Sequence, residues 1–167
     1  MKLRASITVT GSLVAALVLT SCSEPGSPAD DREIDRAADE AEIHALLEAN
    51  WTASSAQDAE GVQATYLPDG DAWIAGLSRR SGADDLRRAE EEFGDMPGFQ
   101  SYDGTIDSVR FISPDAAIVE VSGTTTLDSG SFDEEVTIVV ARGDDNWGIA
   151  AWRVMTFDET LLRMLRE

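Results

Sequence analysis

The apolar pattern of this chain changes its period near Thr105, and the change restricts the folds it can adopt. Before that point, apolar residues recur at the 3.6-residue spacing of helices, and after it they alternate with polar residues. Alternation with a period of two is typical of strands with one buried face. Helices followed by strands indicate an α+β fold rather than a parallel α/β sheet.

Three helices are predicted in the first half of the domain. The second is expected to begin after a cap at Asp58 and to end at Tyr66, and the third to run from residues 82–84 to about Phe93. One face of the first helix gathers its apolar and small polar residues, which are Ile43, Leu46, Leu47, Asn50, Trp51 and Ser54.

The second half is predicted to form an antiparallel meander, because its apparent strands are separated by short turns. A turn at Leu67–Gly70 and a short strand at 71–75 are expected before the third helix. Asp158 is expected to cap a last helix at 159–165. The four strands of the meander are predicted at 106–112, 117–127, 134–142 and 147–157.

The N-terminus has the order of a secretory signal: Lys2 and Arg4, then an uncharged run from Ile7 to Leu19, then small residues. Leu19–Cys22 resembles the lipobox of bacterial lipoproteins. By that resemblance Cys22 becomes the first residue of the mature protein and carries a diacylglycerol thioether (palmitate is the acyl chain we expect). We therefore expect a lipid-anchored protein on the extracytoplasmic side of the cell membrane. The alternative is an ordinary signal peptide that happens to contain a cysteine.

Three segments are predicted: a signal peptide (1–21), a flexible tether (22–31) and one folded domain (32–167). The tether has two prolines, a glycine and no large apolar residue. The chain has 13 basic and 32 acidic residues, and the signal contains two of the basic residues and no acidic one, so the mature net charge is −21. We therefore expect no nucleic-acid partner, because a surface with this negative charge is repelled by the phosphate backbone.

The ordered set of elements and residues resembles the nuclear transport factor two-like superfamily, in its ketosteroid isomerase-like or SnoaL-like branch. The resemblance implies a curved sheet wrapped around helices, a cone-shaped fold with an apolar pocket, and homodimers through the sheet face. It is carried by Trp51, Asp58-Ala59, the stretch from Tyr66 to Gly70, Val109-Arg110-Phe111, the stretch from Ser113 to Ala116, and the stretch from Asn146 to Trp152.

The same resemblance argues against the best-known chemistry of that fold. Ketosteroid isomerases place their aspartate base on the strand after the turn, where this chain has Trp73 or Ile74. The catalytic candidates that remain are weak: Asp71, Tyr66 and His44. Each has a structural alternative, since Asp71 could cap a turn, Tyr66 could pack in the core, and His44 could lie on a solvated helix flank.

Seven residues are predicted to line a pocket, although most of them could equally form the core. Arg153 would need an anionic partner if it faced inward, and would be an ordinary cross-strand charge if it faced outward. No metal or cofactor is predicted, because the aspartates of 69–71 and 144–146 fit turns better than calcium loops. The pocket-lining set is Trp51, Tyr66, Trp73, Phe93, Trp152, Arg153 and Met155.

Three functions are compatible with this sequence. The first is a non-enzymatic envelope lipoprotein whose cone binds a small apolar molecule or a partner. The second is an isomerase or cyclase with a non-standard acid/base site. The third is a dimeric interaction module whose pocket is filled by its own aromatic side chains.

Overall fold

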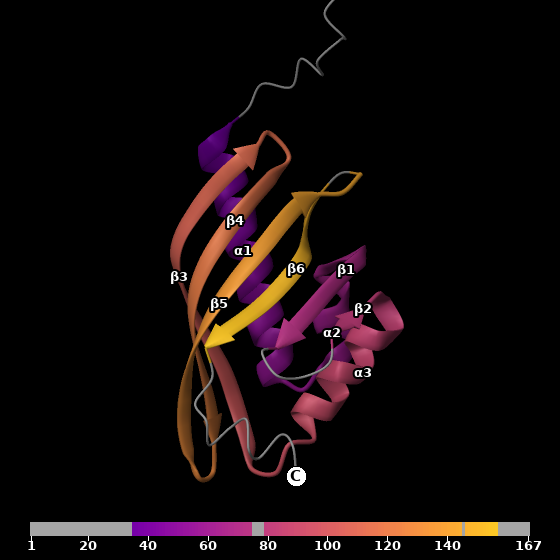
Figure 1. Ribbon diagram of the computed structural model, residues 1–167, viewed down its shortest axis with the longest axis vertical. Helices are drawn as coiled ribbons and strands as arrows, with labels where there is room; N and C mark the ends of the chain where they lie inside the picture. The colour runs from indigo at the N-terminus through magenta and orange to yellow at the C-terminus, as the bar shows by residue number, and fades with distance from the viewer. Residues whose placement is uncertain (1–34, 75–78, 145, 157–167) are drawn as a thin grey trace, which may run out of the picture. The chain divides into compact units, whose positions relative to one another are not determined.

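The computed structural model describes residues 35–74, 79–144 and 146–156, all of which belong to one compact unit, Ile34–Glu167. Its helices are α1 (Arg36–Ser55), α2 (Ala59–Ala64) and α3 (Ala83–Gly94). Its strands, drawn in Figure 1, are β1 (Tyr66–Ile74), β2 (Arg80–Ser81), β3 (Phe99–Ser113), β4 (Ala116–Leu127), β5 (Gly130–Arg142) and β6 (Trp147–Thr156).

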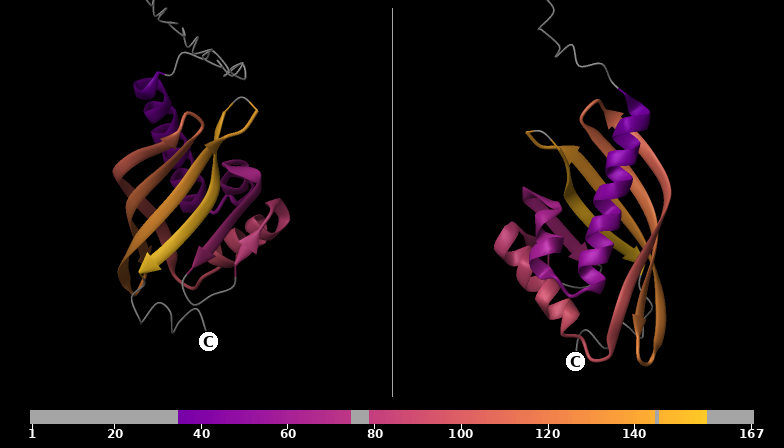
Figure 2. Two further views of the ribbon diagram at one scale, coloured as in Figure 1. Left: turned by 45° about the horizontal axis from the view of Figure 1, so that its top comes forward. Right: turned by 180° about the vertical axis from the view of Figure 1, so that it is seen from behind.

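The described strands form one sheet in the order β2-β1-β6-β5-β4-β3. Only β1 and β6 pair in parallel, and the other neighbours are antiparallel. The predicted meander is therefore β3 to β6, and β1 and β2 extend it beyond β6. Figure 2 shows the helices against one face of this curved sheet, so the α+β prediction is confirmed.

Alternation along the strands gives the sheet two distinct faces. Every second residue of β4 is buried, from Ala117 to Leu127, and so are Val136, Ile138 and Val140 of β5. We call the buried face, which α1 covers, the inner face, and the opposite one the outer face. The core therefore lies between α1 and the inner face.

Helix α1 forms as its apolar stripe predicts. Its N-terminus is capped by Asp35, whose side chain accepts from the backbone N–H groups of Ala37 and Ala38 at 3.1 Å each. A buried arginine of β5, Arg142, forms an ion pair with Asp39 and ties the first turns of the helix to the sheet. The helix residues that are buried include Ile43, Leu47, Asn50 and Ser54, all on the predicted face.

The segment Leu67–Gly70 differs from its prediction. It is part of β1, with an irregular register against β6 between Tyr66 and Asp71, rather than a closed turn. Gly70 does not have a positive φ. A glycine is required at position 70 for a different reason: a Cβ on this residue would lie 2.7 Å from the carbonyl oxygen of Ile149. The glycine thus marks a close approach of two strands.

Two strands are longer than the sequence pattern indicates. β3 begins at Phe99 and β5 at Gly130, several residues before the predicted starts. The added residues are rich in polar and small side chains, which weaken the alternation. They pair with β4, with one register shift in β3 between Phe99 and Ser101. The predicted helix at 159–165 lies outside the described residues, as does Cys22. Among the described helices, none is both long and apolar enough to cross a membrane.

Candidate functional site

Four ionisable side chains from four different elements, two of them buried and two partly buried, lie together near the C-terminal end of α1. We call them the interior polar cluster: Tyr66 (β1), Glu90 (α3), Tyr102 (β3) and Glu134 (β5). The charge of Glu90 raises the pKa of both tyrosines, and that of Glu134 raises the pKa of Tyr102. Contacts place three of them in one region. The adjacent Ser54 and Ser55 of α1 bond to Glu90 and to the Tyr102 backbone, and the Tyr102 and Glu134 side chains both lie over Gly123.

Glu134 occupies a core position of β5, in phase with Val136 and Ile138, and only 8% of it is exposed. The Thr125 hydroxyl donates to its carboxylate at 3.4 Å. Burial raises the pKa of Glu134 from 4.5 to about 7, and the Thr125 and Tyr102 hydroxyls offset only part of that effect. The group therefore exchanges its proton near neutral pH, as acid/base groups of functional sites do.

Tyr102 presents a buried hydroxyl that lacks a partner. Ser55 fixes its backbone, since the serine Oγ donates to the Tyr102 carbonyl at 2.8 Å and accepts from its N–H at 3.0 Å. The hydroxyl comes close enough to Glu134 for each to affect the other's pKa, yet it meets hydrogen-bond geometry with no group among the described residues. Burial first, and then Glu134, raises its pKa well above 10. Trp51 Nε1 is a second buried donor without a described acceptor.

Glu90 forms the other acidic part of the cluster. It follows the buried Leu86 by one helical turn, and Ser54 Oγ donates to its carboxylate at 2.6 Å. Burial raises the pKa of Glu90, and the hydrogen bond from Ser54 offsets part of that shift. The pKa of Tyr66 is raised as well, first by burial and then by the charges of Glu90 and Asp71, while the charge of Arg153 lowers it. Burial thus shifts both groups in the direction of their neutral forms.

Two glycines make room for this arrangement on the inner face. Gly104 and Gly123 are paired directly across β3 and β4. A Cβ on Gly104 would lie 2.5 Å from the indole ring of Trp51, and one on Gly123 would overlap the Tyr102 hydroxyl. The bare backbone of the glycine pair is therefore what allows these aromatic side chains to lie flat against the sheet.

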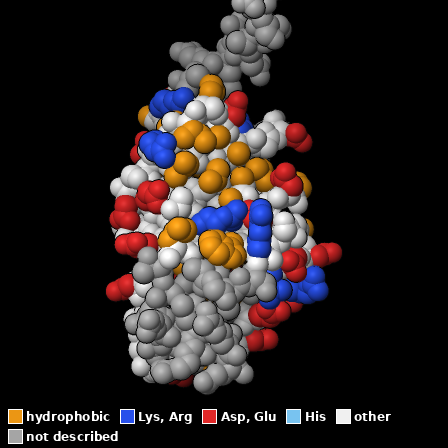
Figure 3. Space-filling view, in the orientation of Figure 1, with side chains coloured by type: hydrophobic (Ala, Val, Ile, Leu, Met, Phe, Trp, Pro, Cys, Tyr) orange, Lys and Arg blue, Asp and Glu red, His pale blue; other side chains and the backbone are white. Residues whose placement is uncertain are grey.

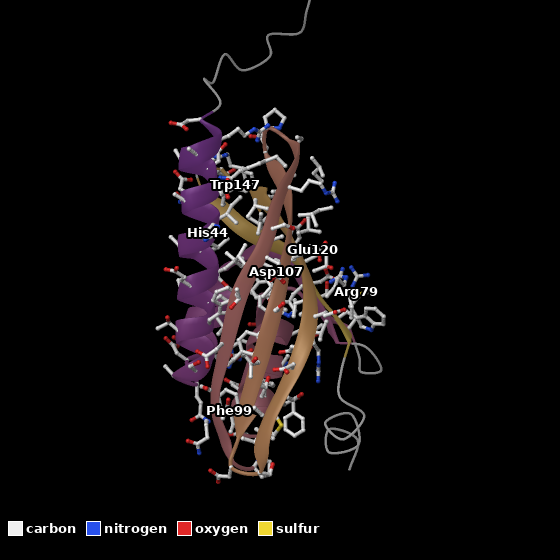
Figure 4. The ribbon with its side chains drawn as sticks, turned by 90° about the vertical axis from the view of Figure 1, so that its left-hand side faces the viewer. His44, Arg79, Phe99, Asp107, Glu120 and Trp147 are labelled. Atoms are coloured by element: carbon white, nitrogen blue, oxygen red, sulfur yellow. The ribbon has the colours of Figure 1, made fainter. Side chains whose placement is uncertain are left out.

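Asp71 lies on the other side of the sheet, in what we call the outer arginine cluster: Asp71, Arg79 and Arg153. Arg153 Nη2 donates to the two carboxylate oxygens of Asp71 at 2.8 and 3.0 Å, and Arg79 forms a second ion pair with it. Figure 4 shows Arg79 and Glu120 on the side of the sheet away from α1. Arg153 thus faces outward and is a cross-strand charge, and its partner Asp71 is only 3% exposed.

The other predicted site residues divide between the two faces. Trp51, Tyr66, Phe93 and Trp152 lie on the inner side. There the Trp152 and Tyr102 rings form a tilted pair with centroids 6.1 Å apart, and Phe93 packs edge-on against Phe99 with centroids 5.0 Å apart. Trp73 and Met155, at 38% and 57% exposure, lie on the outer face together with Arg153. Their alternation with the inward residues Trp152 and Val154 accounts for this orientation.

His44 is not near the interior polar cluster. It precedes Ser54 by ten residues on α1, which corresponds to about 15 Å along a helix axis. Figure 4 places it on the upper half of α1. Of the catalytic candidates predicted from the sequence, only Tyr66 belongs to the cluster.

The sequence pattern missed Glu90, Tyr102 and Glu134. Two of them carried a usable signal, because an acid stood where the pattern required an apolar residue. Glu134 alternates with Val136 and Ile138, and Glu90 is one turn from Leu86 on the buried stripe of α3. Tyr102 had no such signal, because it lies in the part of β3 that the alternation did not reveal. Within the described residues, no group of three or more His, Cys, Asp or Glu is placed to hold a metal ion.

Solved structures define the class of this fold. A cystatin-like domain of unknown function from Nostoc punctiforme superposes with a TM-score of 0.67 at 21% identity, covering 79% of this chain and 86% of that chain. An NTF-2 like protein from Shewanella oneidensis gives 0.61 at 20% identity (69% and 97% covered). A ketosteroid isomerase-like protein from Erwinia carotovora atroseptica gives 0.60 at 21% identity (70% and 95% covered).

The chain therefore has the nuclear transport factor two-like fold that its sequence resembles. No protein-family model matches the sequence, and no curated protein is similar to it. At these identities the likeness establishes the fold alone, so the function must be argued from the site.

Proposed function

We propose that this domain binds a small, largely apolar molecule at the interior polar cluster, as a lipoprotein of the bacterial cell envelope. The observation that carries the proposal is the position of Tyr102, a residue only 6% exposed. Its hydroxyl lies next to the Glu134 carboxyl, whose pKa is about 7, without meeting hydrogen-bond geometry with any described group. A bound molecule would supply the missing hydrogen-bond partners.

The energetics favour a ligand over a purely structural role. A buried polar group without a partner costs about 1–3 kcal/mol, and a core of this size could be completed with apolar side chains instead. Here two carboxyls and two tyrosine hydroxyls, one of each buried and one of each partly buried, lie beside aromatic rings that include Trp152 and Phe99. Sites with a mostly apolar wall and a few converging polar groups are typical of small-molecule binding.

The envelope location rests on the sequence. The lipobox resemblance at Cys22 and the tether that follows it support a lipid anchor that holds the domain at the membrane surface. The mature charge of −21 fits a domain held away from anionic headgroups by that tether.

The proposal is tested by native mass spectrometry of residues 22–167, with a Tyr102→Phe variant. We expect the wild-type chain to carry an adduct that is lost on denaturation, and the variant to carry less of it. The variant should also be more heat-stable when empty, because it no longer buries an unpartnered hydroxyl. A clean apo mass, with no change of melting temperature across a panel of steroids, polyketides and fatty acids, would overturn the proposal in favour of a self-filled interior.

A second candidate function is an acid/base enzyme of the isomerase or cyclase type, which one specific observation favours. The pKa of Glu134, about 7, is suited to a group that both takes and gives protons. One of the structural neighbours is described as ketosteroid isomerase-like. On this alternative Glu134, rather than Asp71 or His44, is the base, so Glu134→Gln should abolish turnover of cyclic ketones while Asp71→Asn should not.

We also propose that two copies can pair through the outer face. Figure 3 shows apolar side chains gathered on this face over β4 to β6, with arginines beside them. Ile112 and Met155 are 53% and 57% exposed, so both large apolar side chains are available for contact with a second copy. Sedimentation at high concentration should give the dimer mass, and Ile112→Glu should shift it to the monomer. A monomer mass for the wild-type chain would contradict the pairing.

A further inference from the structure

The two carboxyl groups of the interior polar cluster have no cationic partner within the described residues. In the part of the chain that the structure describes, no basic side chain forms an ion pair with Glu90 or Glu134. Arg79 and Arg153 bind Asp71, and Arg142 binds Asp39. A buried carboxylate needs a cation or a proton, because its charge is poorly solvated there.

We propose that the ligand of the interior polar cluster carries a protonated amine, which binds between the Glu134 carboxylate and the Tyr102 hydroxyl oxygen. The inference rests on the proposed binding function and narrows it to one class of ligand, an apolar molecule with a basic nitrogen.

The geometry around Gly123 suits an ammonium group. The Glu134 side chain and the Tyr102 hydroxyl both lie over this glycine, so their oxygens lie close together on the inner face. An ammonium has three donors, and a tyrosine hydroxyl has lone pairs that can accept. One ammonium can therefore donate to the carboxylate and to the Tyr102 oxygen, which has no other described partner.

The surrounding rings complete the case for a cation. Tyr102 and Trp152 form a tilted pair with centroids 6.1 Å apart, and Tyr66 and Trp51 pack against the same core. The faces of aromatic rings attract organic cations and also bury apolar substituents. An anionic ligand would instead meet two carboxyl groups, and a neutral one would gain no ion pair with Glu134.

Binding of the amine should displace the proton of Glu134. The groups next to Glu134 are the Tyr102 hydroxyl from β3 and the Thr125 hydroxyl from β4. Tyr102 in turn lies beside the Trp152 ring from β6 and is acted on by the charges of Glu90 from α3 and Tyr66 from β1. The tyrosines stay protonated near neutral pH, and Glu90 titrates in the same direction as Glu134. Affinity should therefore rise with pH, about tenfold per unit below pH 7, and level off above it.

The experiment is calorimetric titration of residues 22–167 with three probes on one skeleton: 1-naphthylmethylamine, 1-naphthalenemethanol and 1-naphthoate. At pH 8 we expect the amine to bind at least tenfold more tightly than the alcohol, with proton release that grows below pH 7, and naphthoate to bind least. Glu134→Gln should remove the preference for the amine. Glu135→Gln, which removes a charge from the neighbouring exposed position, should keep it.

The two proposals fail in different ways. If the alcohol binds as tightly as the amine, or if Glu134→Gln retains the preference, the amine inference is wrong while small-molecule binding stands. If no probe binds and the native mass is that of the empty chain, both are wrong.

Discussion

Glu134 and Tyr102 belong to strands β5 and β3, yet their side chains meet across β4, above the backbone of Gly123. The intervening strand contributes no side chain at this point, so a carboxyl group and a hydroxyl come together in the core. The relationship defines the candidate site, because it places an acid and a hydroxyl next to each other where they are largely excluded from water.

Gly123→Ala should disrupt this relationship. The new Cβ would overlap the Tyr102 hydroxyl and lie 3.0 Å from Glu134 Cγ, inside van der Waals contact. Overpacking of this kind typically costs about 1–3 kcal/mol in the free energy of unfolding, measurable by urea denaturation. Adding Tyr102→Phe should restore part of the loss, since it removes the overlapped oxygen. Strictly additive effects of the two changes would show that the overlap is not the cause.

Stability should depend on pH through Glu134. Its pKa in the folded chain, about 7, is above the ordinary value of 4.5, so the folded state binds the proton more tightly than the unfolded state. The stabilisation is complete below about pH 4.5 and is lost as pH rises through 7, by about 3 kcal/mol at most. Glu134→Gln should remove this decline and be more stable than the wild type at pH 8. Denaturation midpoints from pH 5 to 8 test this, with Glu135→Gln as the control that should still decline.

Much of the fold could be predicted because its signals are local. The stripe containing Ile43 and Leu47 and the alternation from Val119 to Val140 are repeated patterns that the core enforces. Gly70 was misread, since a glycine after a proline is typical of a turn. Here the glycine instead admits a backbone oxygen of β6, a contact between segments far apart in the sequence.

The candidate site was harder to predict because it depends on pairings between strands. The outer arginine cluster requires the parallel pairing of β1 with β6. This pairing brings Asp71 next to Arg153, although the two residues are 82 positions apart in the sequence. The interior polar cluster requires the β3–β4–β5 register, which no local pattern contains. An acid in an apolar phase, as at Glu134, was the one signal available before the structure.

Asp71 should act as a structural ion-pair residue. Asp71→Asn would leave Arg153, whose side chain is 27% exposed, without its charged partner. Because Arg79, the second partner, is largely exposed, we expect a moderate loss of about 1–3 kcal/mol in the free energy of unfolding. Asp69→Asn, an exposed change of the same chemistry on the same strand, should cost less than about 0.5 kcal/mol. Equal losses for both variants would contradict this role.

Cys22 should determine where the protein resides. If the lipobox resemblance holds, the mature chain begins at Cys22 and carries a thioether-linked diacylglycerol, which increases its mass and takes it into the detergent phase of a phase separation. Cys22→Ala should lose the added mass and leave the membrane fraction, because a tether without an apolar segment has no other affinity for lipid. The control is Ser21→Ala, which keeps both the cysteine and the small residue before it. A Cys22→Ala chain that stays in the membrane fraction with residues 1–21 removed would show that something other than the lipid holds it there.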